Sequence, residues 1–190
     1  MTRRTRMLTI FLFMFLFVFG TTARAENDAA LDLLQGYEWK LSEYELSRLG
    51  PEAYKAFLNI AQDETQVNFI RARAITTLTQ FPNEEVWAYF AVELEAEQGD
   101  GNQAKIQRRR LVEGMCDSFL ASRSVQVGEV LAPLLDANGL EVNDVHLKTK
   151  IAKCLQSVNS VQAGHALAEY RGQISEPWEL KAAGFEKELE

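Results

Sequence analysis

One pattern occurs three times in this chain and constrains the fold more than any other feature. Residues 71–78 (RARAITTL), 108–115 (RRRLVEGM) and 148–155 (KTKIAKCL) each run basic, any, basic, apolar, apolar or small, two spacers, apolar. Successive copies start 37 and 40 residues apart. Self-similarity at a period of 20–50 residues is typical of repeat proteins, whose units bury their apolar faces on one another. We therefore expect equivalent apolar positions to be buried in every copy.

Helical periodicity surrounds each copy, and strand-like alternation is scarce. Ser42 followed by Glu45 forms a capping-box pattern, and the short helix that it opens should end at Gly50, before Pro51. Apolar residues at helical spacing, broken by Gly, Pro and Asp, predict the remaining helices. These span about 51–62, 66–80, 84–97, 104–120, 125–135, 145–158, 161–170 and 177–189. The sequence therefore predicts an all-α protein built from helix pairs.

The pairs resemble the HEAT-like helical repeat family, including its short bacterial forms. The residues that carry the resemblance are 130–136 (VLAPLLD), Val145 and 151–155 (IAKCL), with 49–53, Asp63 and 70–74 as a second match. The resemblance covers residues 49–171 and implies an α-α superhelix, a solenoid of about three helix pairs with capping helices. It implies a capping segment at 26–50, repeats at 51–171 and a capping helix at 172–190. The middle unit departs from the family by lacking the turn Asp. An irregular helical bundle or a tetratricopeptide-like array is the alternative.

The N-terminus has the parts of a secretory signal peptide. Residues 1–7 carry three arginines and no acid, residues 8–20 are almost wholly apolar, and Ala23-Arg24-Ala25 is a cleavage pattern. The apolar run is shorter than the ~20 residues of a spanning helix, although an uncleaved anchor is the alternative. We expect cleavage after Ala25 and export to a bacterial periplasm, or secretion, with no membrane span in the mature chain.

The charge balance of the mature chain limits its partners. The signal segment holds four of the 20 Lys and Arg residues, which leaves 16 against 27 Asp and Glu. A net charge near −11 argues against nucleic acid and against anionic lipid, because both need a basic surface. A protein partner is the remaining expectation.

Seven basic residues stand at the starts of the expected second helices: Arg71, Arg73, Arg108, Arg109, Arg110, Lys148 and Lys150. Cations in a first turn oppose the helix dipole by about 0.3–1 kcal/mol each, so something should offset them. In one interpretation they pair with turn carboxylates such as Asp63, Asp136 or Asp144, or with a neighbouring unit, as a ladder of ion pairs. In the other interpretation they form a basic stripe that binds an acidic partner, and Arg109 is the best candidate for an unpaired charge that faces this partner. The ladder is favoured.

Two cysteines, Cys116 and Cys154, lie on apolar faces of adjacent second helices, 38 residues apart. An exported chain with two cysteines permits one disulfide. Packed helices lie ~8–10 Å apart, however, and bridged Cα atoms must approach within about 7 Å. Two buried free thiols are therefore slightly favoured over the bridge.

No catalytic, metal or cofactor site is predicted. His146 and His165 have no ligand-spaced Cys or acid, and none of the common nucleophile, metal or phosphate motifs occurs. Trp87 and Trp178 could be partner contacts, although core or cap packing is favoured for both. Trp39, Tyr44 and Leu46 should cap one end, and Trp178, Leu180 and Phe185 the other.

These observations favour an exported, non-enzymatic scaffold or adaptor that presents a helical-repeat surface to a periplasmic or envelope protein. One alternative is a ligand-binding or enzyme-associated protein, since some HEAT-like relatives belong to bilin-lyase-type families. Another is a structural envelope subunit that assembles with itself. The oligomeric state is not predicted.

Overall fold

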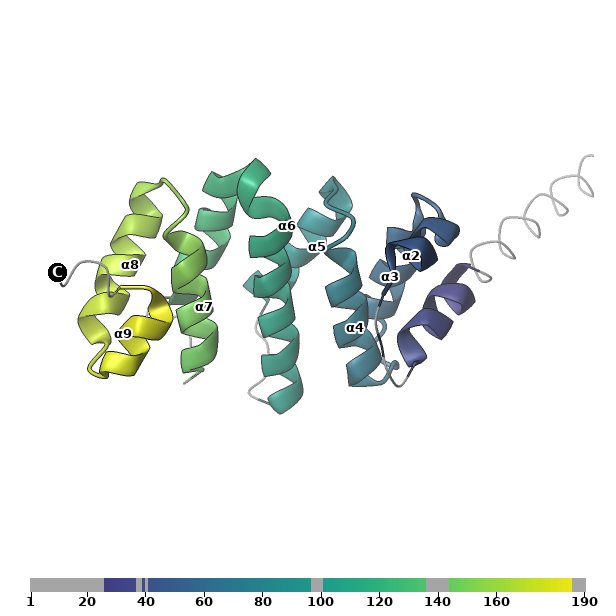
Figure 1. The fold of residues 1–190 in the computed structure, drawn as a ribbon, viewed down its shortest axis with the longest axis horizontal. Helices are drawn as coiled ribbons and strands as arrows, with labels where there is room; N and C mark the ends of the chain where they lie inside the picture. The colour runs from purple at the N-terminus through teal and green to yellow at the C-terminus, as the bar shows by residue number, and fades with distance from the viewer. Residues whose placement is uncertain (1–25, 37–38, 40, 97–100, 136–143, 186–190) are drawn as a thin grey trace, which may run out of the picture. The chain divides into compact units, whose positions relative to one another are not determined.

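The computed structural model describes residues 26–36, 39, 41–96, 101–135 and 144–185, and all regular structure within these ranges is α-helical (Figure 1). Residues 26–35 form a helix. The others are α2 (Glu43–Leu49), α3 (Ala53–Gln62), α4 (Asn68–Leu78), α5 (Glu84–Glu95), α6 (Asn102–Leu135), α7 (Val145–Leu155), α8 (Val161–Gln173) and α9 (Pro177–Ala183). The all-α prediction is confirmed. The predicted signal segment, Ala25 included, lies outside the described residues.

The chain divides into two compact units, one ending at Ala74 and one beginning at Ile75, so that the boundary falls within α4. In the first unit, the predicted capping box is present: the Ser42 hydroxyl accepts from the Glu45 backbone N–H, and Glu45 accepts from the Ser42 backbone. Gly50 ends α2 with a φ of 85°, a left-handed value that other residues rarely adopt. The local signals at this end of the chain therefore fix the helix bounds as expected.

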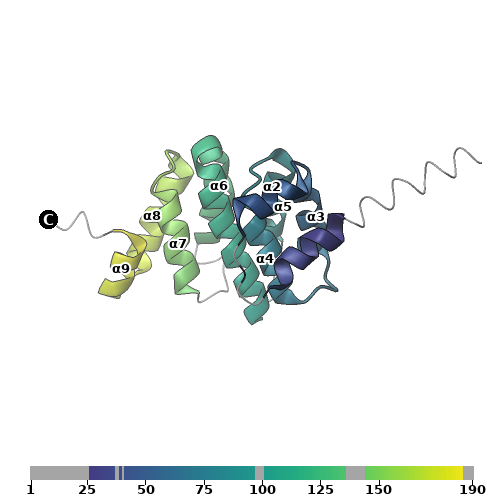
Figure 2. The same cartoon turned by 45° about the vertical axis from the view of Figure 1, so that its right-hand side comes forward.

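In the second unit α6 is the central element. It contacts α5, α7 and α8, and α7 also contacts α9, so that α6, α7 and α8 lie side by side in both cartoon views (Figures 1 and 2). Phe119 of α6 packs edge-on against Trp87 and Phe90 of α5, with ring centroids 5.3 and 6.1 Å apart. Gly114 admits the Phe90 ring, because a Cβ at this position would overlap it.

The apolar positions of the recurring pattern are buried, as the sequence predicts. Each of these residues is at most 2% exposed. The set comprises Ala74, Ile75 and Leu78 in the first copy, Leu111, Val112 and Met115 in the second, and Ile151, Ala152 and Leu155 in the third. The register inferred from the three copies is therefore confirmed at these positions.

One helix boundary is confirmed and another is corrected. The break expected between the helices at 104–120 and 125–135 is present inside α6 as a kink at Arg123, whose φ of −137° and ψ of 37° are not helical. The chain there lacks the Gly or Pro that would end a helix outright. The last helix, expected to reach Leu189, ends at Ala183 because Gly184 takes the left-handed conformation of a helix C-cap.

No helix among the described ranges combines the length and apolar character needed to cross a bilayer.

Candidate binding surface on α6 and α7

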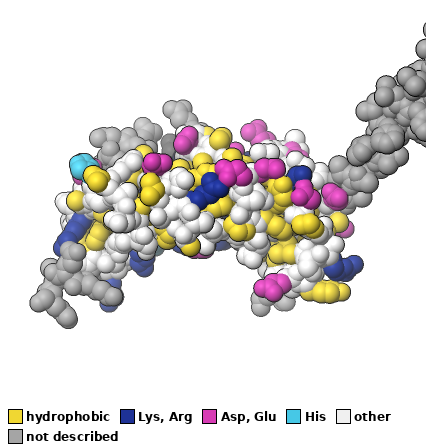
Figure 3. All heavy atoms as spheres, turned by 90° about the horizontal axis from the view of Figure 1, so that it is seen from above, with side chains coloured by type: hydrophobic (Ala, Val, Ile, Leu, Met, Phe, Trp, Pro, Cys, Tyr) yellow, Lys and Arg dark blue, Asp and Glu magenta, His cyan; other side chains and the backbone are white. Residues whose placement is uncertain are grey.

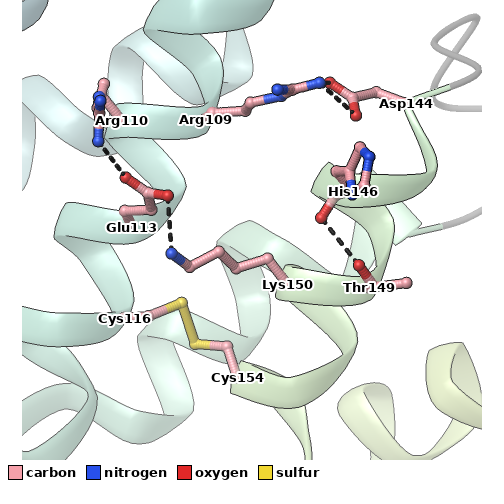
Figure 4. Close-up of polar contacts among 9 residues, drawn as sticks. All are labelled: Arg109, Arg110, Glu113, Cys116, Asp144, His146, Thr149, Lys150 and Cys154. Carbon is pink, nitrogen blue, oxygen red and sulfur yellow. Dashed lines mark hydrogen bonds and ion pairs between the residues drawn. A yellow bond between two sulfur atoms is a disulfide. The ribbon is translucent and has the colours of Figure 1, made fainter. Parts of the chain in front are cut away.

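Three cross-links join the first part of α6 to α7 (Figure 4). They connect Arg109 with Asp144, Glu113 with Lys150, and Cys116 with Cys154. The α6 residues are spaced i, i+4, i+7, which places them on one face of the helix. Because the partners also ascend in number, the two helices run parallel, and the segment between them returns the chain to the same end.

The first cross-link is a bidentate ion pair. The Arg109 guanidinium donates from Nε and Nη2 to the two carboxylate oxygens of Asp144, at 2.8 Å each. Asp144 is also the N-cap of α7 and accepts from the Leu147 backbone N–H at 3.1 Å. Burial alone would raise the pKa of Asp144, but the hydrogen bonds from Arg109 and Leu147 outweigh it and hold that pKa below its ordinary value. The interaction correspondingly raises the pKa of Arg109.

The second cross-link is centred on Glu113, which accepts from Arg110 at 2.9 Å and from Lys150 at 2.7 Å. Burial raises the pKa of Glu113, but the two cations more than offset that effect, and the net shift is downward. Glu113 therefore stays ionised near neutral pH while holding one cation from its own helix and one from α7.

The third cross-link corrects the expectation of free thiols, because Cys116 and Cys154 form a disulfide with Cα atoms 5.9 Å apart. The expectation used the distance between helix axes. Cα atoms lie on a cylinder of radius about 2.3 Å, so residues that face each other across a helix pair come several ångströms closer than the axes do. Two cysteines on facing sides can therefore meet the bridging distance without distorting the helices.

Arg109, Arg110, Glu113, Asp144 and Lys150 are together called the α6–α7 charge cluster. Its three cations are each nearly half exposed, at 43%, 48% and 46% of their side-chain surface. With two carboxylates, the cluster carries one net positive charge. Arg109 is not the free charge that the sequence analysis expected, since it forms the bidentate pair with Asp144. For Arg109 and Lys150 the pairing interpretation is confirmed, whereas Arg110 pairs with Glu113 of its own helix rather than with a turn carboxylate or a neighbouring unit.

The other predicted site residues lie elsewhere. Arg71 and Arg73 belong to the first unit, where they donate to the backbone carbonyls of Ala61 and Leu34. Arg108 is buried rather than on a surface. Asp63 accepts from Thr65. Asp136 falls outside the described residues.

Lys148 and the aromatic candidates also lie apart from the cluster. Lys148 is half-buried on α7, two positions before Lys150, and such positions do not share a helix face. Trp87 is half-buried against Phe119 and lies under the Arg123 guanidinium, which favours the core interpretation of this residue. Trp178 is exposed on α9.

Sequence reasoning missed two acidic partners, Glu113 and Glu84. Glu113 could have been found from its spacing, because it lies three residues after Arg110 and 37 before Lys150, the interval between copies of the pattern. Glu84 at the start of α5 pairs with Arg123 at the kink of α6, 39 residues later. The sequence predicted the break in which Arg123 lies, but not the carboxylate that Arg123 meets there.

No cluster of three or more His, Cys, Asp or Glu side chains suited to a metal ion occurs among the residues that the structure describes. His165 lies 3.5 Å from Glu169 on the same helix. Acidic side chains are scattered over the face shown in Figure 3, with hydrophobic ones exposed between them.

No protein-family model, curated protein or solved structure matches the chain.

The Arg109–Asp144 pair predicts a specific pH dependence. Because the pKa of Asp144 is lowered in the folded state, its stabilising contribution is complete above the unfolded pKa of about 3.9 and is lost as pH falls through the folded value. Asp144→Asn keeps an N-cap acceptor but removes the charge. We expect this variant to be less stable at pH 7 by about 1 kcal/mol, since the exposure of Arg109 screens the pair.

Urea unfolding measured from pH 7 to pH 2 tests this expectation. The stability difference between wild type and Asp144→Asn should narrow below about pH 4. A difference that stays constant over the whole range would show that the charge of Asp144 contributes nothing.

Proposed function

We propose that this protein is an exported, non-enzymatic scaffold built as an α-α superhelix of HEAT-like repeats. Support for the repeat architecture comes from the sequence separations of its long-range links. The polar contacts and the disulfide between helices mostly join residues 35–39 apart: Arg109–Asp144, Glu113–Lys150, Arg73–Gly36, Cys116–Cys154, Arg73–Leu34, Thr79–Ser118 and Glu84–Arg123. This interval matches the 37- and 40-residue offsets of the sequence pattern, as expected where each helix lies beside its equivalent in the next repeat.

Two independent features support export. The first 25 residues have the composition of a signal peptide. The Cys116–Cys154 bridge fits an oxidising compartment, because disulfides persist in the periplasm or outside the cell and are rare in the cytosol.

The α6–α7 charge cluster is the proposed docking surface, and it carries the functional proposal. Its cations are half exposed yet held in fixed positions by Glu113, Asp144 and the nearby disulfide. A preorganised charged surface loses little conformational entropy on binding. On a chain with 27 acidic residues against 20 basic ones, a cluster with excess positive charge is complementary to an acidic segment of a protein partner.

Photo-crosslinking in the periplasm of a two-membrane host tests this proposal, with the crosslinking residue placed at position 106 beside the cluster. We expect one exported or envelope protein to be captured by wild type and by Lys181→Glu, a charge reversal on the exposed side of α9. Capture by Arg110→Glu should fall at least ten-fold, corresponding to about 1.4 kcal/mol of binding energy. Equal capture by the two variants would contradict docking at the cluster, and so would capture that does not weaken with salt.

A further inference from the structure

A second internal repeat links α6 to α8. Residues 124–132 (SVQVGEVLA) and 160–168 (SVQAGHALA) are identical at six of nine positions, with an offset of 36 residues. The first segment lies in α6 just after the kink at Arg123, and the second begins at the N-cap of α8. Both segments are helical and lie in the second unit, so each residue of the first has an equivalent 36 positions later in the second.

The two segments differ in what covers them. Gly128, Leu131 and Ala132 are buried. The turn before α8 packs onto Gly128 so closely that a Cβ there would lie 2.8 Å from Val158 Cγ1 and 3.3 Å from Ser160 Oγ. The face of α6 that carries these residues is thus covered by the chain's own next turn and helix.

The equivalent face of α8 is not covered by any residue that the structure describes. Nothing lies within 4 Å of a Cβ built on Gly164, Ala168 is exposed and Leu167 is only half-buried. Val161 is 93% exposed, whereas its equivalent Val125 is 50% exposed. We call Val161, Gly164, Leu167 and Ala168 the open α8 face. Three of its residues, Gly164, Leu167 and Ala168, correspond to the α6 residues that are buried.

Charge favours a second copy of the chain as the occupant. Two copies of an acidic protein repel each other wherever acids meet, but residues 161–168 contain no acid. His165, the one titratable group in that stretch, faces Glu169 of its own helix. Gly164 and Ala168 are small, so a partner helix can approach closely. The face is thus a place where identical acidic chains can meet without like charges in contact.

We propose that two copies of the protein associate by packing α8 against α8 about a two-fold axis. An antiparallel pair centred between Gly164 and His165 sets Val161 of each copy opposite Ala168 of the other. Such an isologous contact closes at a dimer and does not extend into fibres. A single 13-residue helix per copy gives a small interface, so the expected Kd is in the range of ~1–100 μM.

Sedimentation equilibrium from 1 to 300 μM protein tests the association with two matched variants. Gly164→Glu and Gly172→Glu both replace a glycine of α8 that has open space around it, so both should fold, and Gly172 lies two turns further along the helix. We expect wild type and Gly172→Glu to move from monomer to dimer over this range and Gly164→Glu to bind at least ten-fold more weakly. A wild type that stays monomeric, or equal weakening by both variants, would overturn the proposal.

A crosslink distinguishes the two-fold contact from other modes of self-association. Under oxidising conditions Gly164→Cys, at the centre of the open α8 face, should give a disulfide-linked dimer through position 164, identified by peptide mapping, whereas Gly172→Cys should not. Association that continues beyond a dimer, or that proceeds without the 164–164 crosslink, would overturn packing of α8 on α8. Arg110→Glu should dimerise like wild type, which separates this inference from the docking proposal.

Discussion

Cys116→Ala will lower the free energy of unfolding by about 3–4 kcal/mol, because the disulfide closes a 38-residue loop and so restricts the unfolded chain. The bridge also joins α6 to α7 beside the α6–α7 charge cluster. Its loss is therefore expected to loosen the ion pairs as well as to destabilise the fold. Guanidinium unfolding with and without a reductant measures the effect.

The two cysteines provide their own control. Cys154→Ala breaks the same bond, so it should cost about as much as Cys116→Ala, and the double variant should cost little more than either alone. Reductant should destabilise the wild type and leave the three variants unchanged. Additive losses, or a wild type indifferent to reductant, would show that the bridge does not stabilise the protein.

Phe119→Ala will destabilise the second unit by about 3–5 kcal/mol, the usual cost of emptying a large aromatic site in a core. Phe119 is fully buried in α6 and packs edge-on against the rings of Trp87 and Phe90 in α5. Removing its ring leaves a cavity between the two helices. The shift in denaturation midpoint gives the magnitude, and the loss of near-UV circular dichroism reports the aromatic packing.

Val92→Ala is the matched control for this prediction, since Val92 is a large apolar residue on the exposed side of α5. Its replacement should change stability by no more than about 0.5 kcal/mol. Similar losses for Phe119→Ala and Val92→Ala would mean that the aromatic contact between α5 and α6 is not the core of this unit.

The helix ends that could be predicted from the sequence are those that local signals determine. The box formed by Ser42 and Glu45, Asn83 before α5 and Gly50 after α2 each act within a few residues, so their effect can be read without tertiary structure. The buried positions of the recurring pattern were also predictable. A position that is apolar in all three copies is a more reliable sign of burial than an apolar residue in a single copy. The break between residues 120 and 125 was also predicted, and it is present as the kink at Arg123 inside α6.

The site was harder to predict because its partners are distant in sequence. Asp144 was one of the carboxylates proposed as partners, but Arg109 was expected to be the free charge because it stands among three consecutive arginines and Asp144 lies 35 residues away. The disulfide was disfavoured by a distance between axes that does not apply to facing residues. The repeat that joins α6 to α8 was visible as sequence identity, but it lies in the first helices of the pairs, whereas the basic pattern directs attention to the second ones.

The most direct test of an exported, bridged scaffold is mass spectrometry of the protein purified from the periplasm of a two-membrane bacterium. The account predicts a chain that begins at Glu26 and whose mass is two hydrogens lower than that of the reduced form. After digestion, the peptides that contain Cys116 and Cys154 should be found linked by a disulfide. A chain that begins at Met1 and stays with the membranes, or one that carries two free thiols, would contradict it.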